Sequence, residues 1–103
     1  MANFRVEFTR EALESLMKTR RYIADNLMNP QAAVRYTDRI VSAAESLSIF
    51  PEMHRVRIKD SEGNALRFFP IDNHIIIYYV GESEHVVNIV NVVYSRRNID
   101  AII

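Results

Sequence analysis

The chain has 103 residues, of which 49% are hydrophobic and 25% are charged, and its 13 basic residues are balanced by 13 acidic ones. This length and balance predict one soluble globular domain over residues 1–103 and exclude a disordered or membrane-spanning chain. A net charge of zero argues against affinity that depends on bulk attraction to phosphate backbones. We therefore expect no sequence-specific DNA binding by this chain and no membrane partner.

The sequence contains no cysteine, so disulfides and thiolate metal ligands are excluded. Residues 1–8 lack an apolar core long enough for a signal peptide. Both features predict a cytoplasmic protein.

Residues 4–8 alternate apolar and charged side chains, which predicts a short strand with one buried face. Thr9 follows as a candidate N-cap, with Glu11 in the first turn to suit the helix dipole. Apolar residues at helical spacing then predict an amphipathic helix as far as Leu27.

A second helix is predicted directly after the first. Asn29 provides its cap and Pro30 its first position, and Phe50 and Pro51 are expected to end it. So short a connection makes the two helices antiparallel neighbours. They form a helical hairpin that can cover one face of a sheet.

Between residues 51 and 65 the sequence allows two interpretations. The cations Arg55, Arg57 and Lys59 alternate with apolar residues, which predicts a short strand with three charges on one face. Such a strand is either a sheet edge that its charges protect from aggregation or a basic strip that meets an acidic partner or phosphate. Residues 60–64 then form a turn.

Residues 68–94 are almost uncharged and rich in β-branched and aromatic side chains. Turns divide them into three segments, which predicts an antiparallel meander. Ile75 and Ile76 would point to opposite faces of the sheet. Either other parts of the chain cover both faces, or a binding partner covers one of them. Asn88 and Asn91 interrupt the last strand, which predicts a bulge or an exposed register there.

These elements together predict an α+β fold. It consists of an N-terminal strand, an antiparallel helical hairpin packed on a three- to four-stranded antiparallel sheet, and a short C-terminal helical tail after Tyr94.

This order of elements resembles that of the RelE/ParE superfamily, the toxins of bacterial type II toxin–antitoxin modules. The matching positions are Thr9-x-x-Ala12-x-x-x-Leu16, Ala33-x-x-Tyr36-x-x-x-Ile40, Leu47-x-x-x-Pro51, Leu66-Arg67, the strand from His74 to Tyr79, and Ile89-x-x-Val92-Val93-Tyr94-x-Arg96-Arg97-Asn98-Ile99. No single motif is diagnostic, but their order and separations are fairly specific together. The resemblance implies a growth-inhibiting toxin, without a cofactor, of the kind that stabilises plasmids.

The RelE-like branch of the superfamily cuts messenger RNA on the ribosome. Such cleavage needs cations at the scissile phosphate and groups that exchange protons with the reacting oxygens. The resemblance places a required cation at Ile75 or Ile76 and the terminal acid–base group near Ile102, where neither role can be filled. The cations left for a nuclease are Lys59, Arg67 and Arg96.

The ParE-like branch poisons DNA gyrase by binding it and lacks the nuclease residues. The stretches Leu66-Arg67, 74–79 and 94–99 look closer to this branch, with Tyr94 where many members carry a histidine. The resemblance therefore favours a gyrase-directed toxin. The alternatives are a ribosome-dependent endoribonuclease and a toxin-fold binding module without activity.

The remaining polar residues allow ordinary structural roles. Arg67 either pairs with Glu52, Asp72 or the terminal carboxylate, or contacts a partner. Arg96 and Arg97 are adjacent, so their side chains are expected to point in opposite directions. Only one of them can then form an internal salt bridge.

The three histidines, His54, His74 and His85, lie in different predicted elements without a carboxylate at ligand spacing. We expect surface or turn histidines and no metal site. Ser95 has no recognisable histidine and acid around it, so a hydrolase triad is not expected.

The resemblance also implies a cognate antitoxin, ParD-like or similar, whose disordered segment folds around the toxin. An extended segment would pair with the sheet edge, and an amphipathic helix would lie across the hairpin. Candidates for that surface, if exposed, are Met17, Tyr22, Met28 and Val34. The predicted partner-binding residues are Met17, Tyr22, Arg67, Tyr94, Arg96 and Arg97.

Overall fold

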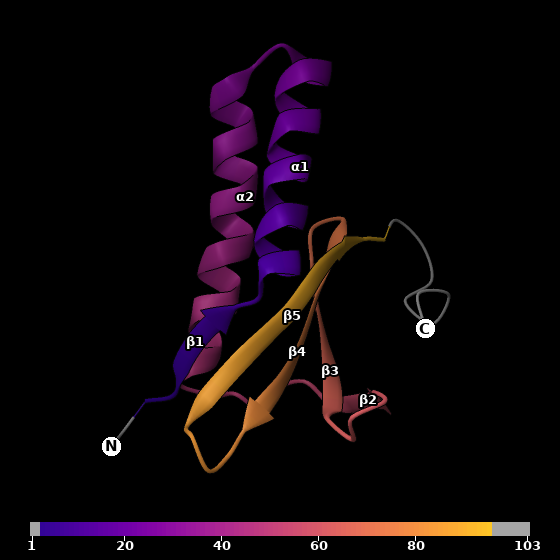
Figure 1. Cartoon of the computed structure of the whole chain (residues 1–103). Coiled ribbons are helices and arrows are strands. Elements are labelled where there is room, and N and C mark those ends of the chain that lie inside the picture. Colours follow the sequence, from indigo (N-terminus) through magenta and orange to yellow (C-terminus); the bar gives the residue numbers. More distant parts are fainter. Residues whose placement is uncertain (1–2, 96–103) are drawn as a thin grey trace.

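The structure, a computed structural model, describes residues 3–95. Its elements are β1 (Arg5–Phe8), α1 (Arg10–Leu27), α2 (Pro30–Glu45), a short 3₁₀ turn η1 (Ser46–Ser48), β2 (Val56–Lys59), β3 (Ala65–Ile71), β4 (His74–Gly81) and β5 (Val86–Tyr94). Two antiparallel helices pack on a sheet, and their connected ends project beyond it (Figure 1). The predicted α+β fold with a helical hairpin is confirmed.

Both helices begin at the predicted caps. The side chain of Thr9 accepts a hydrogen bond from the backbone N–H of Ala12, and Asn29 does the same for Ala32. These bonds satisfy N–H groups that a helix start leaves without partners. The second helix ends earlier than expected: α2 stops at Glu45 and η1 continues the winding to Ser48.

The sheet has five strands in the order β1-β5-β4-β3-β2. β1 runs parallel to β5, and the other neighbours are antiparallel. The predicted sheet of three to four strands consisted of the meander and the charged strand. It did not include the opening strand. β2 lies at one end of this order, so the strand with the cations is an edge strand, a position that fits both predicted roles of those cations.

The predicted bulge lies between the two asparagines of β5. Ile77 pairs with Asn91 while its neighbour Tyr78 pairs with Ile89, so Val90 has no partner residue in β4. The carbonyl of Val90 accepts a hydrogen bond from the Thr9 hydroxyl at 2.7 Å. The Ser15 hydroxyl also donates to the Asn91 side chain, at 2.7 Å. The bulge therefore ties the first turns of α1 to the sheet.

The core lies between the hairpin and the sheet. Its buried members are Ala12, Leu16, Ile40, Ala44, Leu47, Ile76, Tyr78, Val87, Ile89 and Val92. Ile75, which points to the opposite face of β4, is also only 1% exposed. Both faces of the central strand are thus shielded from water, as the missing alternation of polar residues requires. Within residues 3–95, no helix has the length and hydrophobicity needed to cross a membrane.

Candidate functional site

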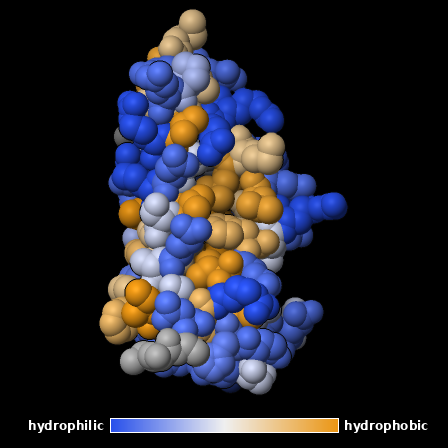
Figure 2. All heavy atoms as spheres, turned by 90° about the vertical axis from the view of Figure 1, so that its left-hand side faces the viewer, coloured by the Kyte–Doolittle hydropathy of each residue, from blue (hydrophilic) through white to orange (hydrophobic). Residues whose placement is uncertain are grey.

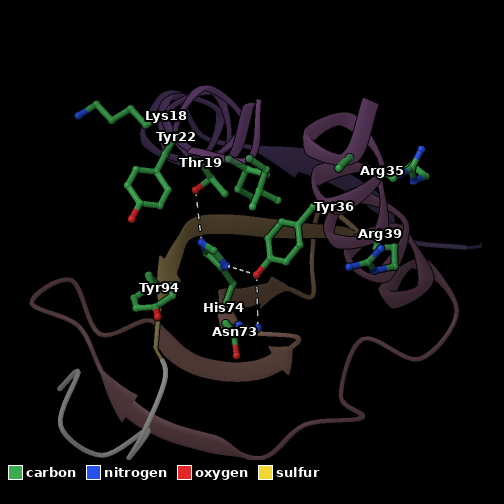
Figure 3. A pocket seen from close by; sticks show the side chains of 12 residues that line it. Lys18, Thr19, Tyr22, Arg35, Tyr36, Arg39, Asn73, His74 and Tyr94 are labelled. Carbon is green, nitrogen blue, oxygen red and sulfur yellow. Dashed lines mark hydrogen bonds between the residues drawn. The ribbon is translucent and has the colours of Figure 1, made fainter. Parts of the chain in front are cut away.

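A cleft of about 780 Å³ lies where the projecting ends of the helices overhang the start of β4. It is lined by Lys18, Thr19, Tyr22, Ile23, Leu27, Ala32, Arg35, Tyr36, Arg39, Asn73, His74 and Tyr94. Figure 3 shows the labelled side chains coming from both helices and from the strands beneath them, with His74 at the centre. The cleft therefore depends on the mutual placement of α1, α2 and the sheet.

His74 joins these three parts of the fold. Its Nδ1 lies 2.7 Å from the hydroxyl of Tyr36 in α2, and its Nε2 lies 3.3 Å from the hydroxyl of Thr19 in α1. The backbone N–H of Asn73 donates to the Tyr36 oxygen at 3.3 Å. The His74 ring also makes edge contacts with the rings of Tyr36 and Tyr94.

Burial favours the neutral forms of His74 and Tyr36. Either ring tautomer of His74 fits these contacts, since the hydroxyl groups of Tyr36 and Thr19 can each donate or accept. Burial lowers the pKa of His74, and the nearby charge of Asp72 offsets part of that effect. Burial likewise raises the pKa of Tyr36, so both groups are neutral at pH 7.

The neutral state of His74 predicts a pH-dependent stability. Below pH 6.5 the unfolded chain protonates this histidine while the folded chain resists, so stability falls as the pH falls from about 7.5 to 5.5. His74→Asn should flatten this dependence in urea unfolding at several pH values. Some slope should remain, because burial also lowers the pKa of His54. An unchanged slope in the variant would show that His74 is not the responsible group.

The rim of the cleft is positively charged. Lys18, Arg35 and Arg39 line it, and none of the acidic residues between positions 3 and 95 does. Arg39 is paired with Asp72 at 3.0 Å and lies over the ring of Tyr36. An apolar floor with cations at the rim suits an apolar side chain that is flanked by carboxylates.

The structure separates two residues that were predicted to share a surface. Tyr22 lines the cleft and is 69% exposed, whereas Met17 is 61% exposed but does not line it. Two side chains that are five positions apart in a helix point about 140° apart around its axis. Met17 instead stands one turn from Leu13, which is also exposed.

The other predicted surface residues are exposed as well. Met28 follows α1 in a left-handed backbone conformation and is 86% exposed, and Val34 of α2 is exposed to a lesser degree. Figure 2, which views the molecule from the side of α2 and β1, shows apolar atoms in a hollow bordered by hydrophilic ones. The hairpin thus carries apolar side chains both in the cleft and outside it.

Among residues 3–95, the basic residues predicted for a site, Lys59 and Arg67, do not line the cleft. Tyr94 lines the cleft, but Arg67 and Lys59 are elsewhere on the sheet. Arg67 is directed into the protein, where its Nη1 donates to the carbonyl of His54 at 2.6 Å and its Nη2 lies 3.8 Å from Glu52. Arg96, Arg97 and the predicted helical tail lie outside the described residues.

Sequence reasoning missed the cluster of Thr19, Tyr36 and His74. The expectation that His74 is a surface or turn histidine is wrong, because it is only 6% exposed. Nothing in the local spacing indicates the cluster, since its members come from three separate elements. Within residues 3–95, no three histidine or acidic side chains are arranged to hold a metal ion.

Solved structures of similar shape come from toxin–antitoxin systems. The chromosomal ParDE system of P. aeruginosa matches with a TM-score of 0.73 and 16% identity, over 89% of this chain and 96% of the other. The RelBE2 toxin–antitoxin complex of Mycobacterium tuberculosis matches with a TM-score of 0.69 and 17% identity, over 94% and 97%. The archaeal RelE–RelB complex of Pyrococcus horikoshii OT3 gives 0.64 and 16%, over 93% and 99%.

At such low identity these likenesses establish the fold, which is that of the RelE/ParE toxins. No curated protein matches the sequence significantly. The family model described as the ParE toxin of the parDE type II toxin–antitoxin system matches residues 6–99. The chain therefore belongs to the ParE toxin family, and the predicted resemblance is confirmed.

Proposed function

We propose that this toxin acts by binding DNA gyrase and that a cognate antitoxin neutralises it. The observation that carries the first part is the apolar character of β4. Ile75 and Ile76, where the nuclease branch needs a cation, are 1% and 0% exposed. A buried isoleucine can neither hold a phosphate nor transfer a proton.

The contacts of Arg67 support the same proposal. This guanidinium is one of the three cations left for a nuclease, and its side chain is only 17% exposed. Its donors are directed to the His54 carbonyl and towards Glu52. A cation held in this way stabilises the loop before β2 and has little capacity left for a substrate phosphate.

His74 is not a substitute for the missing acid–base group. Both of its ring nitrogens are engaged, by Tyr36 and Thr19, and the ring is buried. A general base must come within hydrogen-bond reach of the proton that it removes. The geometry of this histidine favours a structural role over catalysis.

A supercoiling assay tests the proposed target. Purified chain added to DNA gyrase and relaxed plasmid should inhibit supercoiling in a dose-dependent manner, and addition of the antitoxin should restore it. Supercoiling that continues at a large molar excess of folded toxin would refute gyrase as the target. Cut messages in a translating extract would instead support the endoribonuclease, and inertness in both assays would support a binding module without activity.

The antitoxin is proposed from the solved structures of similar shape, which come from toxin–antitoxin systems. The hairpin offers two features that such a partner would use. Exposed apolar side chains, including Leu13 and Met17, suit the apolar face of an amphipathic helix. The cations at the rim of the cleft suit carboxylates on the same segment.

Truncating two side chains tests this assignment. Met17→Ser and Tyr22→Ala should each weaken antitoxin binding by roughly tenfold, since exposed apolar anchors commonly contribute 1 kcal/mol or more. Neither change should alter thermal stability much, because both side chains are exposed in the free chain. Met53→Ser, which removes an exposed methionine far from the hairpin connection, is the matched control. Unchanged affinity in both hairpin variants, measured by calorimetric titration, would refute the assignment.

A further inference from the structure

The segment between α2 and the end of β2 exposes an unusual number of apolar side chains. These are Ile49, Phe50, Met53, Val56 and Ile58, with exposed fractions of 57%, 66%, 54%, 41% and 38%. We call residues 49–58 the exposed corner. Ile49, Phe50 and Met53 also line a hollow of about 520 Å³ together with Pro51 and Glu52. Grouped apolar side chains of this kind mark a binding surface rather than ordinary scattered exposure.

Hydrogen bonds hold the backbone of the exposed corner against the sheet. The buried Tyr78 donates its hydroxyl proton to the carbonyl of Pro51 at 2.8 Å. Arg67 donates to the carbonyl of His54 at 2.6 Å, and the His54 ring stacks on Phe69 with centroids 4.1 Å apart. Polar groups thus point inward while the apolar side chains of Phe50 and Met53 point to water. A surface held in this way loses little conformational freedom when a partner binds.

Residues 49–59 carry a net positive charge. The corner and the next residue carry the cations Arg55, Arg57 and Lys59. Its acid, Glu52, lies 3.8 Å from Arg67. A partner that covers Phe50 and Met53 would therefore gain from carboxylates at its border. A second copy of this chain would instead bring the same cations against one another across a two-fold axis, which is unfavourable.

We propose that the exposed corner is the surface with which the toxin binds its target, through an apolar patch of the target that acidic residues border. This inference rests on the proposed function, a toxin that acts by binding a protein. The exposed corner lies at the opposite end of the helices from the hairpin connection and the cleft (Figure 1). Target binding and the antitoxin contacts proposed for the hairpin therefore use different residues.

Separation-of-function variants of the full chain test this inference. Phe50→Ser combined with Met53→Ser should reduce growth inhibition on induced expression, and inhibition of supercoiling, by about tenfold or more. Arg55→Glu combined with Lys59→Glu should reduce both effects through charge repulsion. Antitoxin affinity and the thermal midpoint should stay close to those of the unchanged chain. Met17→Ser is the reciprocal control, expected to lose antitoxin affinity and keep toxicity.

Each result has one meaning. Full toxicity in the folded Phe50/Met53 variant would overturn the inference while leaving gyrase as the target. Loss of antitoxin affinity in the same variant would also overturn it, because the surface would then belong to the antitoxin. If the unchanged chain fails to inhibit gyrase but the variant still loses toxicity, the inference stands and gyrase is the wrong target.

Discussion

Replacing Tyr78 by alanine should lower the free energy of unfolding by about 3–5 kcal/mol, the range measured for large buried aromatic side chains. The ring of Tyr78 is fully buried in the core on the helix side of β4. Its hydroxyl also holds the carbonyl of Pro51 at 2.8 Å. The change therefore leaves a cavity and removes one hydrogen bond that holds the exposed corner in place. Guanidinium unfolding followed by circular dichroism measures the effect.

Tyr78→Phe is the matched control. It keeps the ring and removes only the hydroxyl, so the expected loss is about 1–3 kcal/mol for a carbonyl left without its donor. Equal losses in the phenylalanine and alanine variants would show that the hydrogen bond to Pro51, and not the packing of the ring, accounts for the stabilisation. No loss in either variant would contradict the described core.

Arg67→Ala should cost about 2–3 kcal/mol of stability, because a charged hydrogen bond to a carbonyl contributes roughly 1.5–3 kcal/mol and the stem of the side chain is also packed. The bond in question joins Nη1 of Arg67 to the His54 carbonyl at 2.6 Å. The contact with Glu52 adds little, since it is 3.8 Å long and Glu52 is largely exposed. Equilibrium unfolding of the purified variant gives the value directly.

Two further variants separate the contributions of Arg67. Glu52→Gln should change stability by no more than about 1 kcal/mol, because exposed ion pairs contribute little. Arg67→Lys keeps the charge but loses the planar donor geometry, so it should fall between the alanine variant and the unchanged chain. If Arg67→Ala is as stable as the unchanged chain, the guanidinium is not a structural anchor, and its availability to a substrate must be reconsidered.

Local features of the fold were predictable because their causes are local. Thr9 and Asn29 begin the helices for reasons that a few neighbouring residues supply. The bulge in β5 was likewise indicated by Asn88 and Asn91 within the strand itself. The parallel pairing of β1 with β5 was missed, since it joins residues about 80 positions apart and no short pattern specifies it.

The residues that meet in the cleft could not be predicted from the sequence for the same reason. His74 lies 38 residues from Tyr36 and 55 from Thr19, so only the folded chain brings them together. The separation of Met17 from Tyr22 does not depend on distant parts of the chain, because helix geometry alone places the two side chains on different faces. That distinction was available from the sequence, and the structure adds that the two faces lead to two surfaces.

The central claim is that this toxin acts by binding a protein and not by cutting RNA. Primer extension on messages from a translating extract, at a toxin concentration that stops gyrase supercoiling, tests it most directly. Intact messages are the predicted result, because β4 presents buried isoleucines where cleavage needs a cation. Ribosome-dependent cuts that disappear when Arg67 is replaced by alanine in a folded variant would contradict the account.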